Sequence, residues 1–327
     1  MRRPSRLGVL GPACLLSGCE GAQSVFTART PEAEAVLGLS WILFVGAAII
    51  FAGVMGLLAW AVLSRARRPP LHGTTLIMAG GFIFPTVTLL ILLTYSLVLS
   101  PVTISPPQED PLRVHVTGHM WWWEVFYEGP DGEPIETANE IRLPLGRPVS
   151  ITVTTSDVIH SFWIPNLTGK IDMIPGHENR IAFTPSQTGV MRGQCAEFCG
   201  LQHAKMAFLA LVETPEDFAA WLESQAGPAR EPATEQLEAG RAAFVEQGCG
   251  GCHAVRGLPG AAGDLGPDLT HVGSRLLLAG FLEGNVGNLG GWIASAQHLK
   301  PGNRMPSFDR LDGPTLRALA AWLESLE

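Results

Sequence analysis

Two short stretches of the chain concentrate the residue types that bind metals or cofactors. The first runs from Cys195 to Met206, reads CAEFCGLQHAKM, and holds two cysteines, a histidine and a methionine. The second runs from Cys249 to His253 and reads CGGCH. A packed core has no need of this grouping, and a disulfide would use only the two sulfurs of each stretch. Because thiolate and imidazole suit copper and zinc, the sequence predicts two occupied sites rather than two cystines.

A further ligand for the first site is His160, which follows a predicted strand earlier in the chain. Zinc could bind two cysteines and two histidines, but the histidines lack the usual H-x3–5-H spacing and Met206 would have no role. A blue-copper site needs only one cysteine, with two histidines and a weak methionine. Two cysteines where one would suffice indicate two metals bridged by two sulfurs.

The second stretch has the C-x-x-C-H spacing at which a c-type haem is attached, with two thioether bonds and a histidine on the iron. A redox-active thiol pair or half of a zinc site is the alternative. Cytochromes of this kind add a methionine on the other face of the haem. After the predicted linker at 227–234 there is one methionine. We therefore expect the haem to be held by Cys249, Cys252, His253 and Met305.

Two uncharged apolar runs, at about 36–63 and 76–99, are each long enough to cross a bilayer. The mean hydropathy of +0.22 and the charged fraction of 16% agree with a chain that lies partly in lipid. The short loop between the runs carries Arg65, Arg67 and Arg68. Such loops stay in the cytoplasm, so residues 20–107 are predicted to form a transmembrane hairpin whose two ends face outward.

The amino-terminal residues 1–19 carry three arginines and a short apolar region, which is typical of a secretory signal. Leu16 to Cys19, with the sequence LSGC, resembles the lipobox of bacterial lipoproteins, in which the cysteine is lipidated after cleavage. A plain or uncleaved leader is the alternative for this segment.

Beyond the hairpin, residues 108–226 are predicted to form a β-sandwich or barrel. Short alternating segments are separated by Pro/Gly turns, and PEDFAAWLESQ follows them as a helix. The predicted strands are RVHVT, VSITVTT, RIAF and AFLALVE. Residues 227–234 are interpreted as a linker and 235–327 as an all-α domain around the CGGCH stretch.

With 16 acidic and 7 basic residues in 108–226, the sandwich could attract a basic partner, or the charge could simply keep it soluble.

The first stretch resembles the C-x-E-x-C-x3-H-x2-M loop of the dinuclear CuA centre in subunit II of cytochrome c oxidase. Three further segments are similar to that family's upstream histidine strand, its following turn and its aromatic cluster: SDVIHSFWIP, KIDMIPG and GHMWWWEVFY. The resemblance covers the hairpin through about residue 225 and implies a cupredoxin-like fold for 108–226. With the CGGCH stretch, it implies the variety of subunit II that carries a fused cytochrome c.

This resemblance implies a role for each residue of the copper loop. Cys195 and Cys199 would bridge both coppers, while His160 and His203 would each bind one. Met206 would be a weak ligand to one copper. The backbone carbonyl of the residue between the cysteines would serve the other copper.

That residue is Glu197, and its side chain would also reach a magnesium ion at the boundary with subunit I. Trp121 would be the aromatic residue through which electrons enter, with a core or rim tryptophan as the alternative. Asp157 is interpreted as either a strand-end surface charge or part of a docking patch.

The implied function is electron input into a haem–copper terminal oxidase. The chain would accept electrons from a c-type cytochrome through haem c and CuA, and pass them to haem a of subunit I for oxygen reduction and proton pumping. The expected partners are subunit I, subunit III, a soluble or membrane-bound cytochrome c and the lipid bilayer, with no nucleic acid. The expected location is the bacterial inner membrane, with two passes and with both termini and both cofactor domains outside the cytoplasm.

The alternative function is a membrane-tethered CuA and haem c protein that serves another reductase. A quinol-oxidase subunit would lack the copper ligands, and a copper carrier would have no use for a fused haem.

One departure from the family concerns the second span, where a Glu-x-x-Trp-Thr motif usually lies seven residues before a proline. Counting back from Pro85 places Met78 and Gly81 at the two motif positions. The chain therefore lacks the intramembrane acid that helps to deliver protons in this family.

Overall fold

The computed structural model describes residues 21–63, 73–104, 110–129 and 132–327. The predicted signal segment with Cys19, and the loop with its three arginines, lie outside the described residues. The chain divides into a helical unit, Pro31–Ser105, and a larger outer unit made of the residues before and after it.

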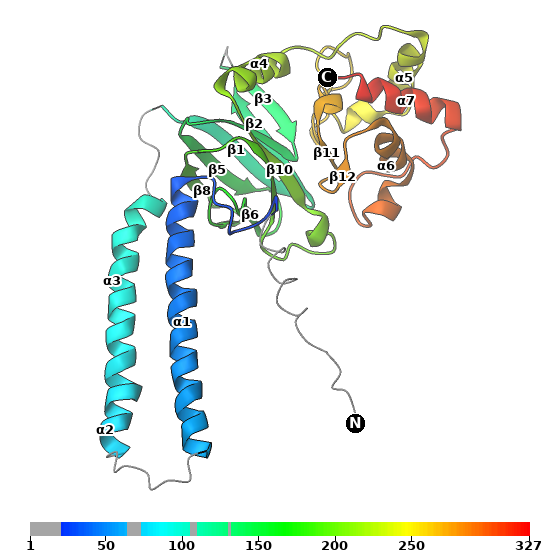
Figure 1. Cartoon of the computed structure of the whole chain (residues 1–327). Helices are drawn as coiled ribbons and strands as arrows, with labels where there is room; N and C mark the ends of the chain where they lie inside the picture. The colour runs from blue at the N-terminus through cyan, green and yellow to red at the C-terminus, as the bar shows by residue number, and fades with distance from the viewer. Residues whose placement is uncertain (1–20, 64–72, 105–109, 130–131) are drawn as a thin grey trace, which may run out of the picture. The chain divides into compact units, whose positions relative to one another are not determined.

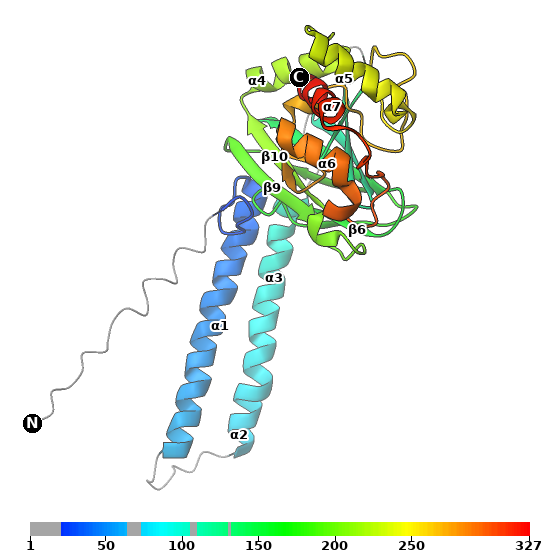
Figure 2. The same cartoon turned by 90° about the vertical axis from the view of Figure 1, so that its right-hand side faces the viewer.

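In the helical unit two long apolar helices run side by side, drawn in blue and cyan in Figures 1 and 2. The first is α1 (Pro31–Leu63) and the second is continuous through α2 (Gly73–Met78), η2 (Ala79–Ile83) and α3 (Phe84–Ile104). Both helices are long and apolar enough to span a membrane, and no residue in the apolar window of either helix is buried. Apolar side chains that face outward all round a helix are suited to lipid.

The second span contains one π-helical turn, η2, just before Pro85. A proline has no N–H group, so the carbonyl four residues earlier loses its usual partner. The backbone adjusts by widening one turn, and the N–H of Phe84 bonds to the carbonyl of Ala79, five residues back. Gly80 and Gly81 lie inside this turn, at the place where the family motif would be.

The outer unit begins its folded part with a β-sandwich of two five-stranded sheets (Figure 1). One sheet has the order β3 (Pro134–Ala138), β2 (Trp122–Glu128), β1 (Leu112–His119), β5 (Val149–Thr155), β8 (Asn179–Phe183). The other has the order β4 (Glu140–Pro144), β10 (Ala207–Glu213), β9 (Gly189–Cys195), β6 (His160–Trp163), β7 (Ile171–Met173). The turn η3 (His203–Lys205) precedes β10, and the helix α4 (Pro215–Ala226) follows it.

The core of the sandwich forms because alternate residues of each strand point inward. In β1 the buried positions are Leu112, Val114 and Val116. Near the middle of the core, the rings of Phe162 and Phe208 stack at 4.9 Å between centroids. This packed core supports the ends of β6 and β9, from which the first candidate site projects.

The segment that precedes α1 is attached to the sandwich. The backbone N–H of Arg29 donates to the carbonyl of Asn166, and the N–H of Arg192 donates to the carbonyl of Ala22. The buried hydroxyl of Thr30 donates to the carbonyl of Leu167. The residues just before the first span thus belong to the same folded unit as the domain that follows the second span.

The carboxyl-terminal region is mainly helical. Its elements are α5 (Glu235–Glu246), η4 (Cys249–Gly251), η5 (Val272–Ser274), β11 (Leu277–Leu278), β12 (Leu282–Glu283), α6 (Val286–Leu299) and α7 (Gly313–Glu324). Side chains at the helix starts accept backbone N–H bonds, for example Thr234 from Leu237. The predicted fold class is confirmed: a membrane-anchored chain with a two-helix hairpin, a cupredoxin-like sandwich and a helical cytochrome c domain. The short β11–β12 ladder is an addition that the sequence did not indicate.

Candidate metal and cofactor sites

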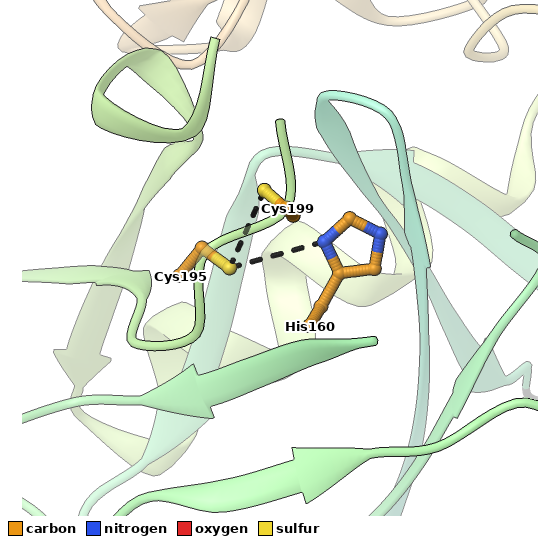
Figure 3. Close-up of side chains that lie close together, drawn as sticks. All are labelled: His160, Cys195 and Cys199. Atoms are coloured by element: carbon orange, nitrogen blue, oxygen red, sulfur yellow. Dashed lines mark hydrogen bonds between the residues drawn. The ribbon is translucent and has the colours of Figure 1, made fainter. Parts of the chain in front are cut away.

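The two thiols of the first stretch lie together at the end of β9. Cys195 closes the strand and the next turn returns Cys199 toward it, so the two sulfurs are 3.8 Å apart and both are free thiols (Figure 3). His160, at the start of β6, has its Nδ1 3.8 Å from the sulfur of Cys195. The three ligand atoms lie within 4.8 Å of one another and all three residues are buried. Two sulfurs and an imidazole form a donor set that suits copper.

The remaining predicted ligands also contact this sulfur pair. Nδ1 of His203 lies 3.6 Å from the sulfur of Cys199. The sulfur of Met206 lies 3.7 Å from the same atom. On the other side, the backbone carbonyl of Glu197 is 3.1 Å from the sulfur of Cys195. Each cysteine therefore has one imidazole and one weaker donor beside it.

The imidazole of His160 is oriented by Asp157. A carboxylate only accepts, so Nε2 of His160 donates to Oδ1 of Asp157, at 2.8 Å, and Nδ1 is left to face Cys195. The other carboxylate oxygen accepts from the backbone N–H of Met120 at 2.7 Å. Burial alone would raise the pKa of Asp157, but these hydrogen bonds lower it. Asp157 is not a free surface charge, because its side chain is 14% exposed and is bonded to His160. Its part in a docking patch stays a prediction.

The two thiols influence each other's proton affinity. The hydrogen bond between the two thiols lowers the pKa of Cys195, against the opposing effect of burial. The same interaction raises the pKa of Cys199. One proton is therefore released easily and the other is retained between the sulfurs. A bound cation would take the place of the retained proton, because thiol ligands bind metals in their deprotonated form.

Trp121 lies directly against the cysteine loop. Its indole Nε1–H donates to the carbonyl of Cys199 at 2.8 Å, and the side chain is 8% exposed. A Cβ built on Gly302 would lie 3.6 Å from the far edge of the same ring. Trp121 therefore has the metal-binding loop on one side and the segment before Met305 on the other.

The CGGCH stretch follows α5 through Gly248, whose φ of 70° suits a glycine at a helix end. Cys252 is exposed and Cys249 is half-buried. Nδ1 of His253 donates to the carbonyl of Pro267 at 2.8 Å, which leaves Nε2 as the donor for a metal. Burial lowers the pKa of His253 and so favours the neutral form that binds metals. The residues present thus fit a covalently attached haem.

The fourth expected haem residue, Met305, packs on the same apolar core as Cys249. Its backbone N–H donates to Oδ1 of Asn303, and its carbonyl accepts from Nε2 of Gln297 on α6, both at 2.7 Å. The methionine loop is therefore fixed to a helix of the domain.

Comparison with known proteins identifies the domains that carry the two candidate sites. The family model described as cytochrome c oxidase subunit II, periplasmic domain, matches residues 130–212, and the model described as cytochrome c matches residues 237–327. The cytochrome c oxidase subunit 2 of Alkalihalophilus pseudofirmus is 32% identical over 95% of this chain and 94% of its own length. The chain belongs to the cytochrome c oxidase subunit 2 family. The Bacillus subtilis relative is 32% identical over 67% of this chain and 63% of its own.

Among solved structures, the periplasmic domain of subunit II of the Bradyrhizobium japonicum oxidase is 33% identical, covers 36% of this chain and 96% of its own, and has a TM-score of 0.34. The family assignment makes this chain a subunit II of a haem–copper oxidase that carries a cytochrome c domain. It implies copper in the sandwich and haem in the helical domain, association with other oxidase subunits, and a membrane anchor with an outer domain.

Two contacts within this subunit were not anticipated from the sequence. The first centres on Lys300, which is 2% exposed. Its ammonium group donates to the carbonyls of Trp121, Lys205 and Ala279 at 2.6, 3.0 and 2.7 Å. Burial lowers the pKa of Lys300 to about 7, and the charge of Lys205 adds to the lowering. Lys300 therefore joins the segment before Met305 to the cysteine-containing loop at 195–206. Nothing in its local sequence distinguishes it from a surface lysine.

The second contact joins the helical domain to β3 and β4. Oε1 of Glu136 accepts from the backbone N–H of Asp268 at 3.0 Å, and Oε2 of Glu140 accepts from the N–H of Leu276 at 2.9 Å. The buried guanidinium of Arg275 donates to the carbonyl of Asp268. The alternation of buried residues in β3 is compatible with an outward-facing Glu136 side chain. The sequence did not indicate its hydrogen-bond partner, Asp268, because the two residues are more than a hundred positions apart.

Proposed function

We propose that this subunit accepts electrons from a c-type cytochrome through a covalent haem c and a dinuclear CuA centre, and delivers them to haem a of subunit I. The observation that carries the proposal is the free thiol pair, with its sulfurs 3.8 Å apart and an imidazole nitrogen beside each. When bound, the two cofactors supply one-electron transfer. The chain itself provides fixed ligands, exclusion of water and a contact between the two sites.

The proposed CuA ligands are the six residues that converge at the end of β9. Cys195 and Cys199 would bridge two coppers, and each imidazole would bind one. Because the donors come from two strands and one turn of a packed sandwich, they have little freedom to change position when the charge of the site changes. The full proposed set is His160, Cys195, Glu197 through its carbonyl, Cys199, His203 and Met206.

The proposed haem c would be held by Cys249 and Cys252 through thioether bonds and by His253 and Met305 as ligands of its iron. Trp121 is proposed as the residue that connects the haem domain to the copper site. In support, Gly302 lies close to its ring, and its indole N–H is bonded to the carbonyl of Cys199. An external donor would therefore meet the haem domain before it meets Trp121.

The side chain of Glu197 is the proposed magnesium ligand at the boundary with subunit I. It is 45% exposed and its carboxylate lies 4.0 Å from the ammonium group of Lys170. The proposed partners are subunit I, subunit III and a cytochrome c donor. When the subunits assemble, groups from the partner subunit would have to replace the ammonium group of Lys170 beside the carboxylate of Glu197.

We also propose the topology of a two-pass inner-membrane protein with both termini and both cofactor domains outside the cytoplasm. The hydrogen bonds between residues 22–30 and the sandwich support it, because they hold the segment before the first span beside the domain after the second. The two ends of the hairpin then lie on one side of the membrane. The loop between the spans, with its three arginines, would face the cytoplasm.

The test of the cofactor assignment uses the purified full chain loaded with copper and matured with haem. The wild type should contain two coppers per chain and show a near-infrared charge-transfer band together with a c-type α-band. Cys195→Ser should lose the near-infrared band and keep the α-band. As the matched control, Cys252→Ser should lose normal haem attachment and keep the near-infrared band. Persistence of the near-infrared band in Cys195→Ser would refute the copper assignment.

A further inference from the structure

A single peptide group links the sandwich to the histidine proposed to bind the haem iron. Its carbonyl, from Pro267, accepts a hydrogen bond from Nδ1 of His253 at 2.8 Å. Its N–H, from Asp268, donates to Oε1 of Glu136 on β3 at 3.0 Å. The carboxylate of one domain is therefore connected, through one amide, to the imidazole of the other.

We propose that Glu136 is a positioning residue that sets how strongly His253 donates electrons to the haem iron, and thereby the reduction potential of haem c. This inference rests on the proposed function, in which His253 ligates a haem attached to Cys249 and Cys252. It gives the sandwich a part in tuning a cofactor that it does not itself bind.

The physical reason is the polarisation of the shared amide. A carboxylate that accepts from the N–H increases the negative charge on the carbonyl oxygen, because linked hydrogen bonds strengthen one another. A stronger acceptor draws the Nδ1 proton away from the ring and makes Nε2 a better donor. Outer partners of a ligating histidine raise its basicity in this way. Since ferric iron gains more than ferrous iron from a stronger donor, the bond from Glu136 should lower the potential.

The surroundings of Glu136 make its charge sensitive to pH. Burial is the main cause that raises the pKa of Glu136 to about 7, while the bond from Asp268 opposes the rise. The neighbouring charges of Glu124 on β2 and of Asp268 raise the pKa further, and Arg275 lowers it. A neutral carboxyl accepts more weakly than a carboxylate. The potential of haem c should therefore rise as the pH falls through neutrality.

The experiment is an optical redox titration of the c-type α-band in the full-length, haem-loaded chain. Glu136→Gln keeps the size of the side chain and an acceptor oxygen but removes the charge. We expect a higher midpoint potential, seen as an increase of about two- to tenfold in the ratio of ferrous to ferric haem at a fixed ambient potential, where tenfold is about 59 mV for one electron. The dependence of the potential on pH between about 6 and 8 should also flatten.

Two further variants separate the hydrogen bond from the charge. Glu124→Gln removes a nearby carboxylate whose partner is His119 and which makes no bond to the shared amide. At a pH well above 7, where Glu136 is ionised in both proteins, it should leave the potential close to that of the wild type. Glu136→Asp keeps the charge but shortens the side chain, so it withdraws the acceptor from Asp268. It should raise the potential although the net charge is unchanged.

The possible failures are distinguishable. A wild type without a c-type α-band would overturn the proposed haem site and this inference with it. A normal α-band with equal potentials in the wild type, Glu136→Gln and Glu136→Asp would overturn the inference alone. Equal shifts in Glu136→Gln and Glu124→Gln, with none in Glu136→Asp, would assign the effect to net charge and likewise overturn the role of the bond.

Discussion

At the scale of single residues, His160 has one ring nitrogen bonded to Asp157 and the other beside Cys195. The orientation of this proposed ligand thus depends on a carboxylate that lies outside the ligand set. Asp157 in turn is held by the backbone N–H of Met120, next to Trp121. The copper loop, the histidine strand and the tryptophan therefore share one hydrogen-bond network.

We predict that Asp157→Ala lowers copper affinity by about 10- to 100-fold, because it removes the group that fixes the ring of His160. Asp157→Asn keeps an oxygen that can accept from Nε2 and should lose much less. Competition with a chelator, followed by the near-infrared band, measures both. A similar loss in the two variants would contradict the argument.

The sequence predicted a set of ligands whose sulfur and nitrogen atoms lie together in the structure, but it did not predict the residues that orient them. Two cysteines, a histidine and a methionine at such short spacing are typical of a metal site, whereas an aspartate three residues before a histidine is common in turns. Lys300 and Glu136 were missed because their partners are far away along the chain. Charged residues of these types are mostly exposed, so their burial follows from the contact between domains rather than from local pattern.

At the scale of elements, alternation identified β1, β5, β8 and β10 but not the other strands of the sandwich, β9 among them. Two glycines break the pattern of β9, and one of them has a structural reason. Gly193 pairs with Phe208 on β10, and a Cβ there would lie 2.1 Å from the phenyl ring. His160, expected after a strand, follows β5 across the polar turn at Ser156 and Asp157, and it begins β6.

In the cytochrome domain α5 packs on α7 through Gly240, where a Cβ would lie 2.2 Å from the carbonyl of Ala318. Gly240→Ala should lower the free energy of unfolding by about 1–3 kcal/mol, since the helices must move apart. Gly291→Ala on α6 is the matched control, because nothing lies within 4 Å of its added methyl group. It should be neutral or stabilising by up to about 1 kcal/mol. Denaturant unfolding followed by circular dichroism measures both, and equal stability of the two variants would contradict the prediction.

At the scale of the whole outer unit, the contact between the sandwich and the helical domain includes buried charges. Lys300 supplies an ammonium group to three carbonyls, two of them from the sandwich, and Glu136 and Glu140 accept two backbone N–H groups from the helical domain. Hydrogen bonds of this kind are directional, so they fix one arrangement of the two domains rather than merely holding them together.

Lys300→Met should loosen this contact, because it leaves carbonyl groups without a donor at a cost of about 1–3 kcal/mol. We expect faster backbone hydrogen exchange at 299–302 and slower electron transfer between the two sites, with both optical bands unchanged. Lys170→Met is the control, since that side chain is 52% exposed. Unchanged exchange in Lys300→Met would show that the contact does not depend on the lysine.

Stability should also depend on pH through Glu136. Its pKa is raised from 4.5 to about 7 by burial, so the folded chain binds more protons than the unfolded chain between these values. The contribution of Glu136 is fully present below about pH 4.5 and is lost as the pH rises through about 7. Relative to Glu136→Gln, the wild type should therefore become less stable from pH 5 to pH 8. Denaturant midpoints of both proteins at each pH provide the measurement, and a constant difference would disprove the linkage.

The π turn at Ala79–Ile83 has a consequence for engineering the second span. One inserted residue rotates every side chain before it by about 100° relative to a uniform helix. Counting positions back from Pro85 therefore misplaces the azimuth of Met78 and its predecessors. A carboxylate introduced to restore a proton route should be tried at Ile77 as well as at Met78, because with the wide turn Ile77 takes the direction that Met78 would have in a uniform helix.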